Sequence, residues 1–195
     1  MMKKTVGIWT IAAGMAVSAV GLAGCNASAV NLSGVSATQT VTESEAQTEA
    51  EQDNALRVYL AGPFFNETEI GNIETAEKIL EQRGFSYFSP MRYTVDAEEG
   101  TKEWGRQIFE LDKNEIQKAD VVVAIYYASN GDTGTAWECG YASAIDKPVV
   151  LVHVDENLDS NLMIHCGCTT NISLKDLESY DFDAMPVYEY EGDMK

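Results

Sequence analysis

The sequence predicts an α/β fold in which helices cover both faces of a mainly parallel β-sheet. After residue 55, short apolar runs alternate with longer segments of helical period, which is typical of successive strand and helix units. The run at 121–127 (VVVAIYY) carries no charged residue and is typical of a strand buried on both faces. Because crossovers between parallel strands are right-handed, these units favour a Rossmann-like or flavodoxin-like three-layer sandwich.

The predicted elements follow one another along the chain. A first strand at 58–61 ends at Gly62, and the apolar stripe of the helix that follows it ends before Gly84, which supplies a C-terminal stop. The elements are expected at 58–61 (strand), 68–83 (helix), 85–88 (strand), 101–118 (helix), 121–127 (strand), 134–146 (helix) and 149–154 (strand).

The loops that follow the strands at 58–61 and 121–127 should lie at the same edge of the sheet. Ligands of parallel sheets bind at the carboxyl ends of the strands, so the loops 62–65 and 129–132 should converge on one site. The helix over 101–118 is expected to bury one apolar stripe, which consists of Trp104, Ile108, Leu111 and Ile116.

The net negative charge of the chain limits which ligands and macromolecules it can bind. The 195 residues carry 31 acidic and 13 basic side chains, and the formal net charge is -18. Such a chain repels the phosphates of nucleic acids and anionic lipid headgroups, so DNA and RNA are excluded as partners and small neutral ligands are favoured.

Residues 1–24 are expected to be a lipoprotein signal peptide. Lys3 and Lys4 precede an uncharged, mostly apolar run at 6–22. The segment ends in Leu-Ala-Gly-Cys, which resembles the bacterial lipobox, whose cysteine is diacylated, so Cys25 would hold the protein on the extracytoplasmic face of the cell membrane. A plain signal peptide and a transmembrane anchor are the alternatives.

Residues 25–54 are expected to form a disordered acidic tether, and residues 55–195 the functional domain. After its first residue the tether is rich in Ser, Thr, Ala, Gln and Glu and has no Lys, Arg or aromatic residue, so it cannot bury enough apolar surface to offset the entropy of ordering.

The cysteines of the domain suggest a zinc site, but their number and spacing argue against one. Cys139, Cys166 and Cys168 are an odd number, so at least one thiol should be free. The run at 165–168 (HCGC) could supply zinc ligands, but a second half-site is absent from the sequence. We therefore expect no metal and no cofactor.

Three carboxylates are the candidate catalytic groups. Glu138 lies near the N-terminus of its predicted helix, on a stripe of small and apolar residues, and the alternative is a glutamate that only complements the helix dipole. Asp112 stands four residues from both Ile108 and Ile116, which places it on the buried stripe unless the helix is rotated by a residue or two. Asp132 could equally be a helix N-cap. Converging carboxylates beside aromatic residues would suit cleavage of a glycosidic bond.

Five segments in the same order resemble nucleoside 2-deoxyribosyltransferases, and the resemblance spans nearly the whole domain. They are 59–65 (YLAGPFF), Asp112 before Ile116, 132–142 (DTGTAWECGYA), 161–163 (NLM) and 188–192 (YEYEG).

The resemblance implies a two-step transfer of 2-deoxyribose between nucleobases. Glu138 would be the nucleophile that forms a covalent deoxyribosyl ester, and attack by a second base would give net retention at the anomeric carbon. Asp112 and Asp132 would bind the sugar or base and help to protonate the leaving base; which of the two is the acid stays open.

The same resemblance implies roles for residues that bind the substrate. Tyr59 or the loop of Gly62, Phe64 and Phe65 would lie along the sugar and base, and Tyr141 would orient the nucleophile. Asn161 and Met163 would reach the site of a neighbouring subunit, which implies a homo-oligomer with 2'-deoxynucleosides and free nucleobases as its ligands.

One segment departs from the family pattern. Residues 89–93 (SPMRY) stand where transferases carry a glutamine that reads the base, so Arg92 could admit a more anionic ligand. Two alternative functions stay open: a nucleoside hydrolase, in which water intercepts the ester, and a non-catalytic lipoprotein that binds nucleosides.

Overall fold

The computed structural model describes residues 56–155, 161–193 and 195. The predicted signal peptide at 1–24, the lipid-bearing Cys25 and the tether at 25–54 lie outside the described residues.

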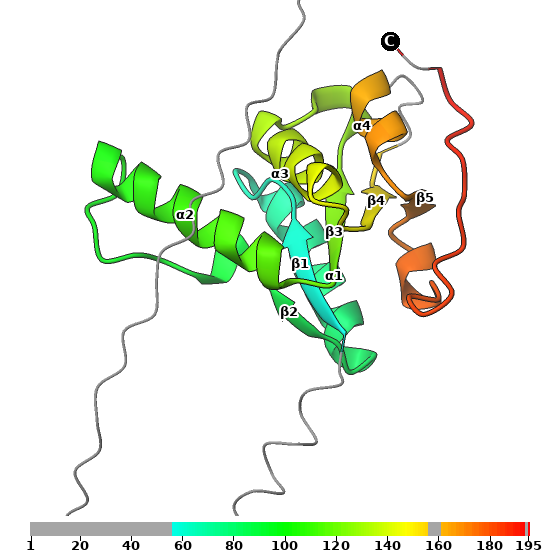
Figure 1. The fold of residues 1–195 in the computed structure, drawn as a ribbon, viewed down its shortest axis with the longest axis horizontal. Helices are drawn as coiled ribbons and strands as arrows, with labels where there is room; N and C mark the ends of the chain where they lie inside the picture. The colour runs from blue at the N-terminus through cyan, green and yellow to red at the C-terminus, as the bar shows by residue number, and fades with distance from the viewer. Residues whose placement is uncertain (1–55, 156–160, 194) are drawn as a thin grey trace, which may run out of the picture. The chain divides into compact units, whose positions relative to one another are not determined.

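Within the described part of the chain, five parallel strands form the sheet, in the order β2-β1-β3-β4-β5 (Figure 1). This order reverses direction between β1 and β3, as in doubly wound flavodoxin-like folds, and it confirms the predicted α/β class. The fifth strand was not predicted, because its sequence is short and three of its four residues are polar. The strands are β1 (Arg57–Ala61), β2 (Ser86–Phe88), β3 (Val121–Tyr126), β4 (Val149–His153) and β5 (Thr170–Ser173).

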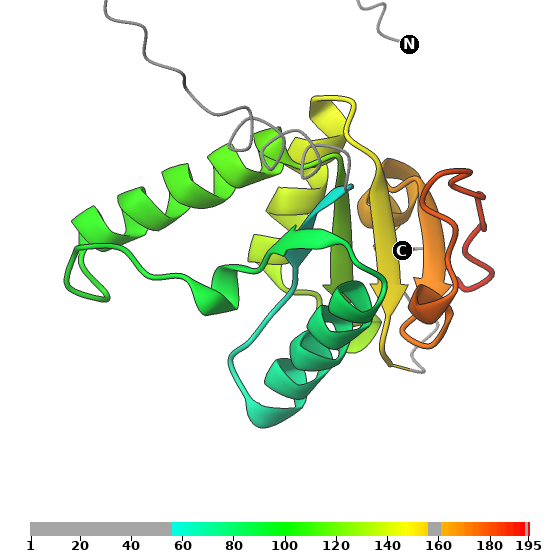
Figure 2. The ribbon, with the colours of Figure 1, turned by 90° about the horizontal axis from the view of Figure 1, so that it is seen from below.

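Helices lie on both faces of this sheet, which gives the predicted three layers (Figure 2). The helix α1 (Glu67–Gln82) covers one face, and the helices α2 (Lys102–Lys118), α3 (Thr133–Ala144) and α4 (Leu162–Gly167) lie on the other. Short 3-10 turns complete the described elements: η1 (Pro90–Arg92), η2 (Ala128–Asn130) and η3 (Asp176–Glu178).

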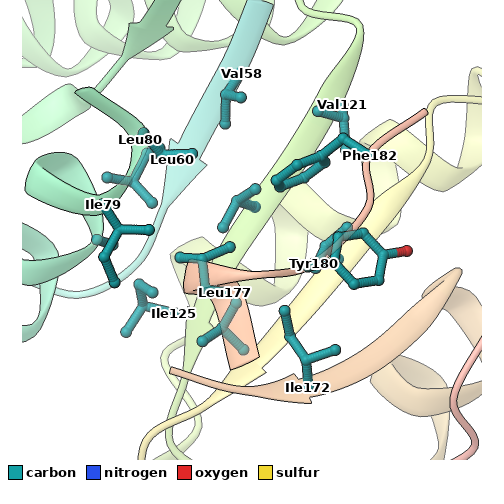
Figure 3. Close-up of a cluster of buried hydrophobic side chains, with 14 of the residues drawn as sticks. Val58, Leu60, Ile79, Leu80, Val121, Ile125, Ile172, Leu177, Tyr180 and Phe182 are labelled. Carbon is teal, nitrogen blue, oxygen red and sulfur yellow. The ribbon is translucent and has the colours of Figure 1, made fainter. Parts of the chain in front are cut away.

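The core consists of one apolar cluster on each face of the sheet. Alternate residues of β1 point to opposite faces, so Val58 and Leu60 pack with α1 while Tyr59 packs with α3. Figure 3 shows the first of these clusters, where Leu177 of η3 lies with Leu60 of β1. All six residues of β3 are buried, as its uninterrupted apolar sequence predicted.

The buried stripe predicted for α2 was wrong over the first half of the helix. Ile116 is fully buried, whereas Trp104, Ile108 and Leu111 are only partly covered. Figure 1 shows the physical reason: the first turns of α2 extend beyond the edge of the sheet, so no sheet surface lies beneath them. These apolar side chains are therefore available to line a cavity.

A cluster of two histidines fastens the C-terminal segment to the sheet. His153 Nε2 and His165 Nδ1 both contact the Oδ1 atom of Asn171, at 3.2 and 2.8 Å. The ring of Tyr190 stacks on His165 with a centroid distance of 3.8 Å. The backbone N–H of Asn171 also donates to the carbonyl oxygen of Tyr188, so the segment that carries both tyrosines lies along β5.

We expect this cluster to make stability depend on pH. Burial lowers the pKa of His153 and of His165, although the contact with Asn171 opposes the shift and nearby Asp155 adds to that opposition at His153. The unfolded chain therefore binds protons more readily, so stability is lost as pH falls below the unfolded pKa of about 6.5. Thermal melting of the protein between pH 7.5 and 5.5 measures the loss. The His165→Phe variant, which keeps a flat ring against Tyr190, should lose less over that range; parallel melting profiles would contradict the prediction.

Three further findings concern only the described residues. None of their helices is long and apolar enough to cross a bilayer. No three of their His, Cys, Asp and Glu side chains are grouped so that they could hold a metal ion. Cys139, Cys166 and Cys168 are all free thiols, which agrees with the prediction from their odd number.

Candidate active site

A cavity of about 560 Å³ opens at the carboxyl ends of β1, β2 and β3, where the site was predicted. It brings together all three candidate carboxylates, which come from α2, from the residue before α3 and from α3 itself. Its described lining residues are Gly62, Phe64, Phe65, Pro90, Met91, Tyr93, Thr94, Ala97, Glu99, Trp104, Ile108, Leu111, Asp112, Asp132, Gly134, Thr135 and Glu138.

Glu138 is held by a buried tyrosine. The Tyr59 hydroxyl donates to Glu138 Oε1 at 2.5 Å from beneath the cavity, and Tyr59 is fully buried. Burial raises the pKa of Glu138 to about 8; the hydrogen bond from Tyr59 opposes the shift, and the charges of Asp112 and Asp132 add to it. Burial beside the same carboxylates also raises the pKa of Tyr59, so the phenol stays protonated and remains a donor.

Asp112 lies half-buried on α2, on the same cavity as Glu138. Burial raises the pKa of its carboxyl to about 6. A carboxyl group with a pKa this close to neutrality is suited to carry a proton to a leaving group. Asp112 was predicted to lie on the buried stripe of its helix, but it is only partly covered and lines the cavity together with Ile108.

Asp132 is the N-cap of α3 and also lines the cavity. Its Oδ2 atom accepts hydrogen bonds from the backbone N–H of Thr135 at 2.6 Å and from the Thr135 hydroxyl at 2.8 Å. Its other oxygen, Oδ1, has no hydrogen-bond partner among the described residues. The N-cap interpretation is thus correct, and it leaves one oxygen for a ligand.

The loop after β1 is fixed at both ends. Gly62 has a φ of 155°, and a Cβ atom there would stand 2.7 Å from Ile73 Cδ1 and 3.0 Å from Ile125 Cβ. Downstream, the backbone N–H of Phe65 donates to Glu69 Oε2 at 2.8 Å, while Asn66 caps α1. These contacts hold the aromatic loop against the cavity.

We expect Gly62→Ala to destabilise the fold by about 1–3 kcal/mol, because the added methyl group meets packed side chains and the backbone angle disfavours L-residues. The free energy of unfolding in urea measures the cost. Gly71→Ala is the matched control: a Cβ atom at Gly71 meets nothing within 4 Å, and this glycine lies inside α1, so alanine there should stabilise. Equal effects at both positions would contradict the steric argument.

Tyr141, Asn161 and Met163 lie away from the Glu138 carboxylate and its hydrogen bond. Tyr141 was expected to orient Glu138, but its hydroxyl accepts a hydrogen bond from Gln117 Nε2 at 2.6 Å, and the orienting bond comes from Tyr59. Asn161 and Met163 line a second cavity of about 440 Å³ between α3 and α4, which Asp132 also lines. Their reach into a neighbouring subunit stays a prediction.

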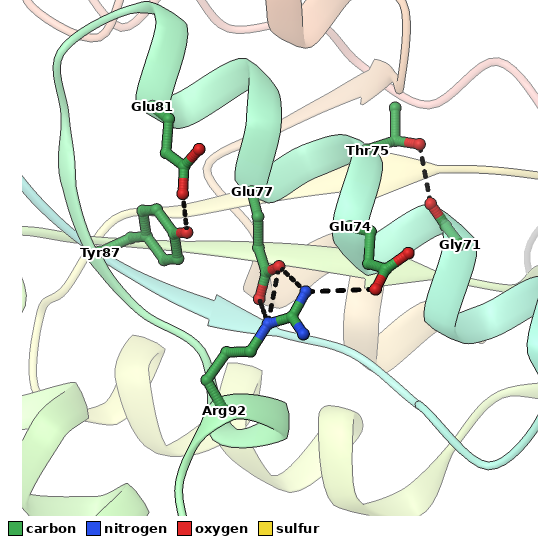
Figure 4. A network of polar contacts seen from close by, with 7 residues as sticks. All are labelled: Gly71, Glu74, Thr75, Glu77, Glu81, Tyr87 and Arg92. Atoms are coloured by element: carbon green, nitrogen blue, oxygen red, sulfur yellow. Dashed lines mark hydrogen bonds and ion pairs between the residues drawn. The ribbon is translucent and has the colours of Figure 1, made fainter.

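Arg92 does not face the cavity as a free cation. Its guanidinium donates to both carboxylate oxygens of Glu77 and to Glu74 on α1, as Figure 4 shows. The suggestion that Arg92 admits an anionic ligand is therefore wrong for this conformation. The described residues that line the cavity include four carboxylates and no Lys, Arg or His.

Sequence reasoning missed several residues of the cavity wall. Trp104 and Ile108 were assigned to the core, because a helical stripe of apolar residues does not reveal whether a sheet or a ligand covers it. Tyr93 and Glu99 lie in the irregular segment between β2 and α2, which has no period to interpret.

The model of one protein family matches residues 58–176, which is more than half of the chain; that family is described as nucleoside 2-deoxyribosyltransferase. The chain belongs to the nucleoside 2-deoxyribosyltransferase family. The match runs from the second residue of β1 through β5 and includes the three candidate catalytic carboxylates and four of the five motif segments, so the resemblance is confirmed at the level of the family.

Known members and relatives differ in activity. A nucleoside deoxyribosyltransferase of Limosilactobacillus fermentum is 30% identical over 145 residues, which are 65% of this chain and 86% of that protein. A protein of Thermofilum pendens, provisionally named 2'-deoxynucleoside 5'-phosphate N-hydrolase 1, is 30% identical over 109 residues, or 54% and 73% of the two chains. The 2-deoxyribosyltransferase of Bacillus psychrosaccharolyticus is 35% identical in sequence, and its structure matches with a TM-score of 0.64. The match covers 69% of the present chain and 98% of the Bacillus chain.

Proposed function

We propose that the protein transfers 2-deoxyribose between nucleobases, with Glu138 as nucleophile. The observation that carries this proposal is the pairing of Glu138 with a buried tyrosine donor in a cavity that also holds Asp112. The pKa values of both carboxyl groups are raised, so near neutral pH the pair can hold a single proton, as glycosidic cleavage by one nucleophile and one acid requires. Family membership supports an enzyme that transfers or hydrolyses glycosyl groups.

The reaction takes two displacements. The Glu138 carboxylate attacks the anomeric carbon, the bond from that carbon to the base nitrogen breaks, and Asp112 delivers a proton to the leaving base. A glycosyl ester remains on Glu138. A nitrogen of the second base then attacks the same carbon from the opposite side, its proton passes to Asp112, and Glu138 leaves as a carboxylate. Tyr59 stabilises the carboxylate in the free and product states through its hydrogen bond.

We expect a bell-shaped dependence of kcat/KM on pH, with flanks near 6 and 8. Below about 6, Asp112 and Glu138 are both protonated and no nucleophile exists; above about 8, both are ionised and no acid remains. Between these values the pair holds one proton, mainly on Glu138, and the form that reacts is the minority form in which the proton has moved to Asp112. The two groups interact, so the flanks belong to the pair. Initial rates from pH 5 to 9 check this. The Asp112→Asn variant should keep only the acid flank, and a pH-independent rate would contradict the assignment.

Substrates without phosphate are favoured by the charge of the cavity. Four carboxylates and no basic residue stand among the described lining residues, so a 5'-phosphate would meet repulsion without a compensating cation. We therefore propose 2'-deoxynucleosides as donors and free nucleobases as acceptors. This choice differs from the substrate in the name of the Thermofilum pendens relative.

A hydrolase is the second candidate, supported by that relative's name. It would use the same residues, with water in place of the second base. Chromatography of the purified protein with deoxyinosine, with and without excess adenine, separates the two. Deoxyadenosine formed only with adenine supports transfer, whereas hypoxanthine and free deoxyribose in both samples support hydrolysis. No reaction with either, together with measurable nucleoside binding, would favour a non-catalytic binding lipoprotein.

Location and assembly complete the proposal. The basic start, the apolar run and Cys25 support a lipid anchor on the extracytoplasmic face of the membrane. Asn161 and Met163 are exposed and line a second cavity that shares Asp132 with the main one, which supports a homo-oligomer in which subunits share sites. Metabolic labelling with palmitate, compared with a Cys25→Ala variant, tests the anchor.

A further inference from the structure

We propose that Tyr93 is the surface on which the nucleobase stacks, and that the ion pair of Arg92 with Glu77 holds it in place. The proposal rests on the proposed function, since it names the residue that would bind the base at the same site. It concerns the segment at 89–93, in which Arg92 is engaged by Glu77 and Glu74.

Three aromatic rings stack in series from the nucleophile to the rim of the cavity. The rings of Tyr59 and Phe88 have a centroid distance of 5.7 Å and an interplanar angle of 18°. The rings of Phe88 and Tyr93 follow at 4.2 Å and 20°. Tyr59 donates to Glu138 at one end of this series, so the position of the Tyr93 ring is fixed relative to the reacting carboxylate through two buried rings.

Tyr93 has a ring face and a hydroxyl left for a ligand. Phe88 covers one side of the ring, yet 52% of Tyr93 is exposed, and Tyr93 lines the cavity that holds Glu138. Its hydroxyl has no hydrogen-bond partner among the residues described. Met91 and Trp104 line the same cavity and add apolar surface to it. A flat, half-exposed ring in such surroundings is suited to stack against another flat ring.

The turn that carries Tyr93 is fastened to α1. The backbone N–H of Tyr93 donates to the carbonyl oxygen of Pro90 at 3.1 Å, which closes η1 immediately before it. Within that turn the Arg92 Nε atom donates to both oxygens of Glu77 at 3.0 Å, and only 6% of the Glu77 side chain is exposed (Figure 4). A two-point contact with a nearly buried carboxylate fixes orientation better than a single contact, so Arg92 positions the ring that follows it.

This arrangement predicts how the base is recognised. Stacking needs only a flat π-face, so it tolerates different bases and favours those with two fused rings over those with one. The enzyme should therefore accept several nucleobases and bind purines more tightly than pyrimidines.

Calorimetric titration of the purified protein with adenine and with cytosine tests the proposal. Tyr93→Leu should weaken adenine binding by at least about tenfold and cytosine binding by less, while Tyr93→Phe stays within about twofold of the parent. Tyr188→Leu is the matched control, because Tyr188 is equally exposed, at 53%, and does not line this cavity. Far-UV circular dichroism and melting temperature confirm that each variant is folded.

The outcomes separate the two proposals. Adenine binding unchanged in Tyr93→Leu overturns the stacking role while leaving the proposed function intact. Equal losses in Tyr93→Leu and Tyr93→Phe would assign the effect to the hydroxyl and overturn stacking. Failure of the parent protein to bind any nucleobase overturns both proposals. For Arg92, the Arg92→Met variant should raise KM for the acceptor base with kcat nearly unchanged, and a loss confined to kcat would overturn the positioning role.

Discussion

Replacing Glu138 with glutamine should lower kcat by about 10⁴-fold or more, which is the largest effect that we expect from a single substitution. The amide has nearly the shape of the carboxyl group but cannot form the glycosyl ester, so the first displacement is lost. Binding should survive, because the amide can still accept the hydrogen bond that Tyr59 donates to the carboxylate. Single-turnover measurements with a deoxynucleoside, together with titration of the same ligand, check both statements.

Glu110→Gln is the control for this substitution. Glu110 is exposed on α2 and contacts only Lys113 among the described polar partners, so the same chemical change there should leave kcat and binding near the parent values. Mass spectrometry of the protein quenched during turnover adds a direct readout, since a covalent deoxyribosyl adduct should appear in the parent and be absent from Glu138→Gln. Undiminished turnover in Glu138→Gln would remove Glu138 from the mechanism.

Replacing Asp112 with asparagine should lower kcat by about 10²–10⁴-fold, because the base then leaves without general acid assistance. The loss should shrink for donors whose base is a better leaving group, since such a base needs less protonation. The substitution also removes a negative charge that raises the pKa of Glu138, so the nucleophile should ionise at a lower pH. Rates for a series of donors, each measured across pH, check the three effects together.

Asp96→Asn provides the matched change for Asp112. Asp96 is exposed in the segment before α2 and does not line the cavity, so its amide variant should show parent kinetics across the donor series. If the loss in Asp112→Asn were the same for all donors, the role of Asp112 would be to bind the sugar, and Asp132 would become the candidate acid.

The pattern of the sequence was sufficient for the architecture because burial on both faces leaves a clear trace. The strand β3 has six buried residues and an uninterrupted apolar sequence, and it fixes the centre of the sheet. The strand β5 was missed for the opposite reason: Thr170 and Asn171 are polar, and the hydroxyl of the buried Thr170 accepts a hydrogen bond from the backbone N–H of Tyr188. That contact joins residues far apart in the sequence, so no local pattern predicts it.

The residues of the candidate site also differ in whether a local sequence pattern could predict them. The three carboxylates were found because each breaks or ends an apolar helical pattern, and the motif around Glu138 matched a family. The residue that holds Glu138 could not be assigned from spacing, since Tyr59 lies 79 positions away and only the pairing of β1 with its neighbours brings it beneath α3. Tyr93 could not be predicted for a similar reason, because its role depends on stacking against Phe88, which lies in another element, β2.

Because the first turns of α2 extend beyond the sheet, a small tilt of the helix would move the side chains that line the cavity. The helix is anchored to the body at Ile116, and Trp104 lies twelve residues earlier, which is about 18 Å along the axis at 1.5 Å per residue. A tilt of about five degrees at the anchor would move that indole by roughly 1.5 Å, which is enough to admit or refuse a ring substituent. We therefore expect contacts between α2 and α3, such as the hydrogen bond between Gln117 and Tyr141, to influence the range of substrates accepted at this wall, which makes them starting positions for directed evolution.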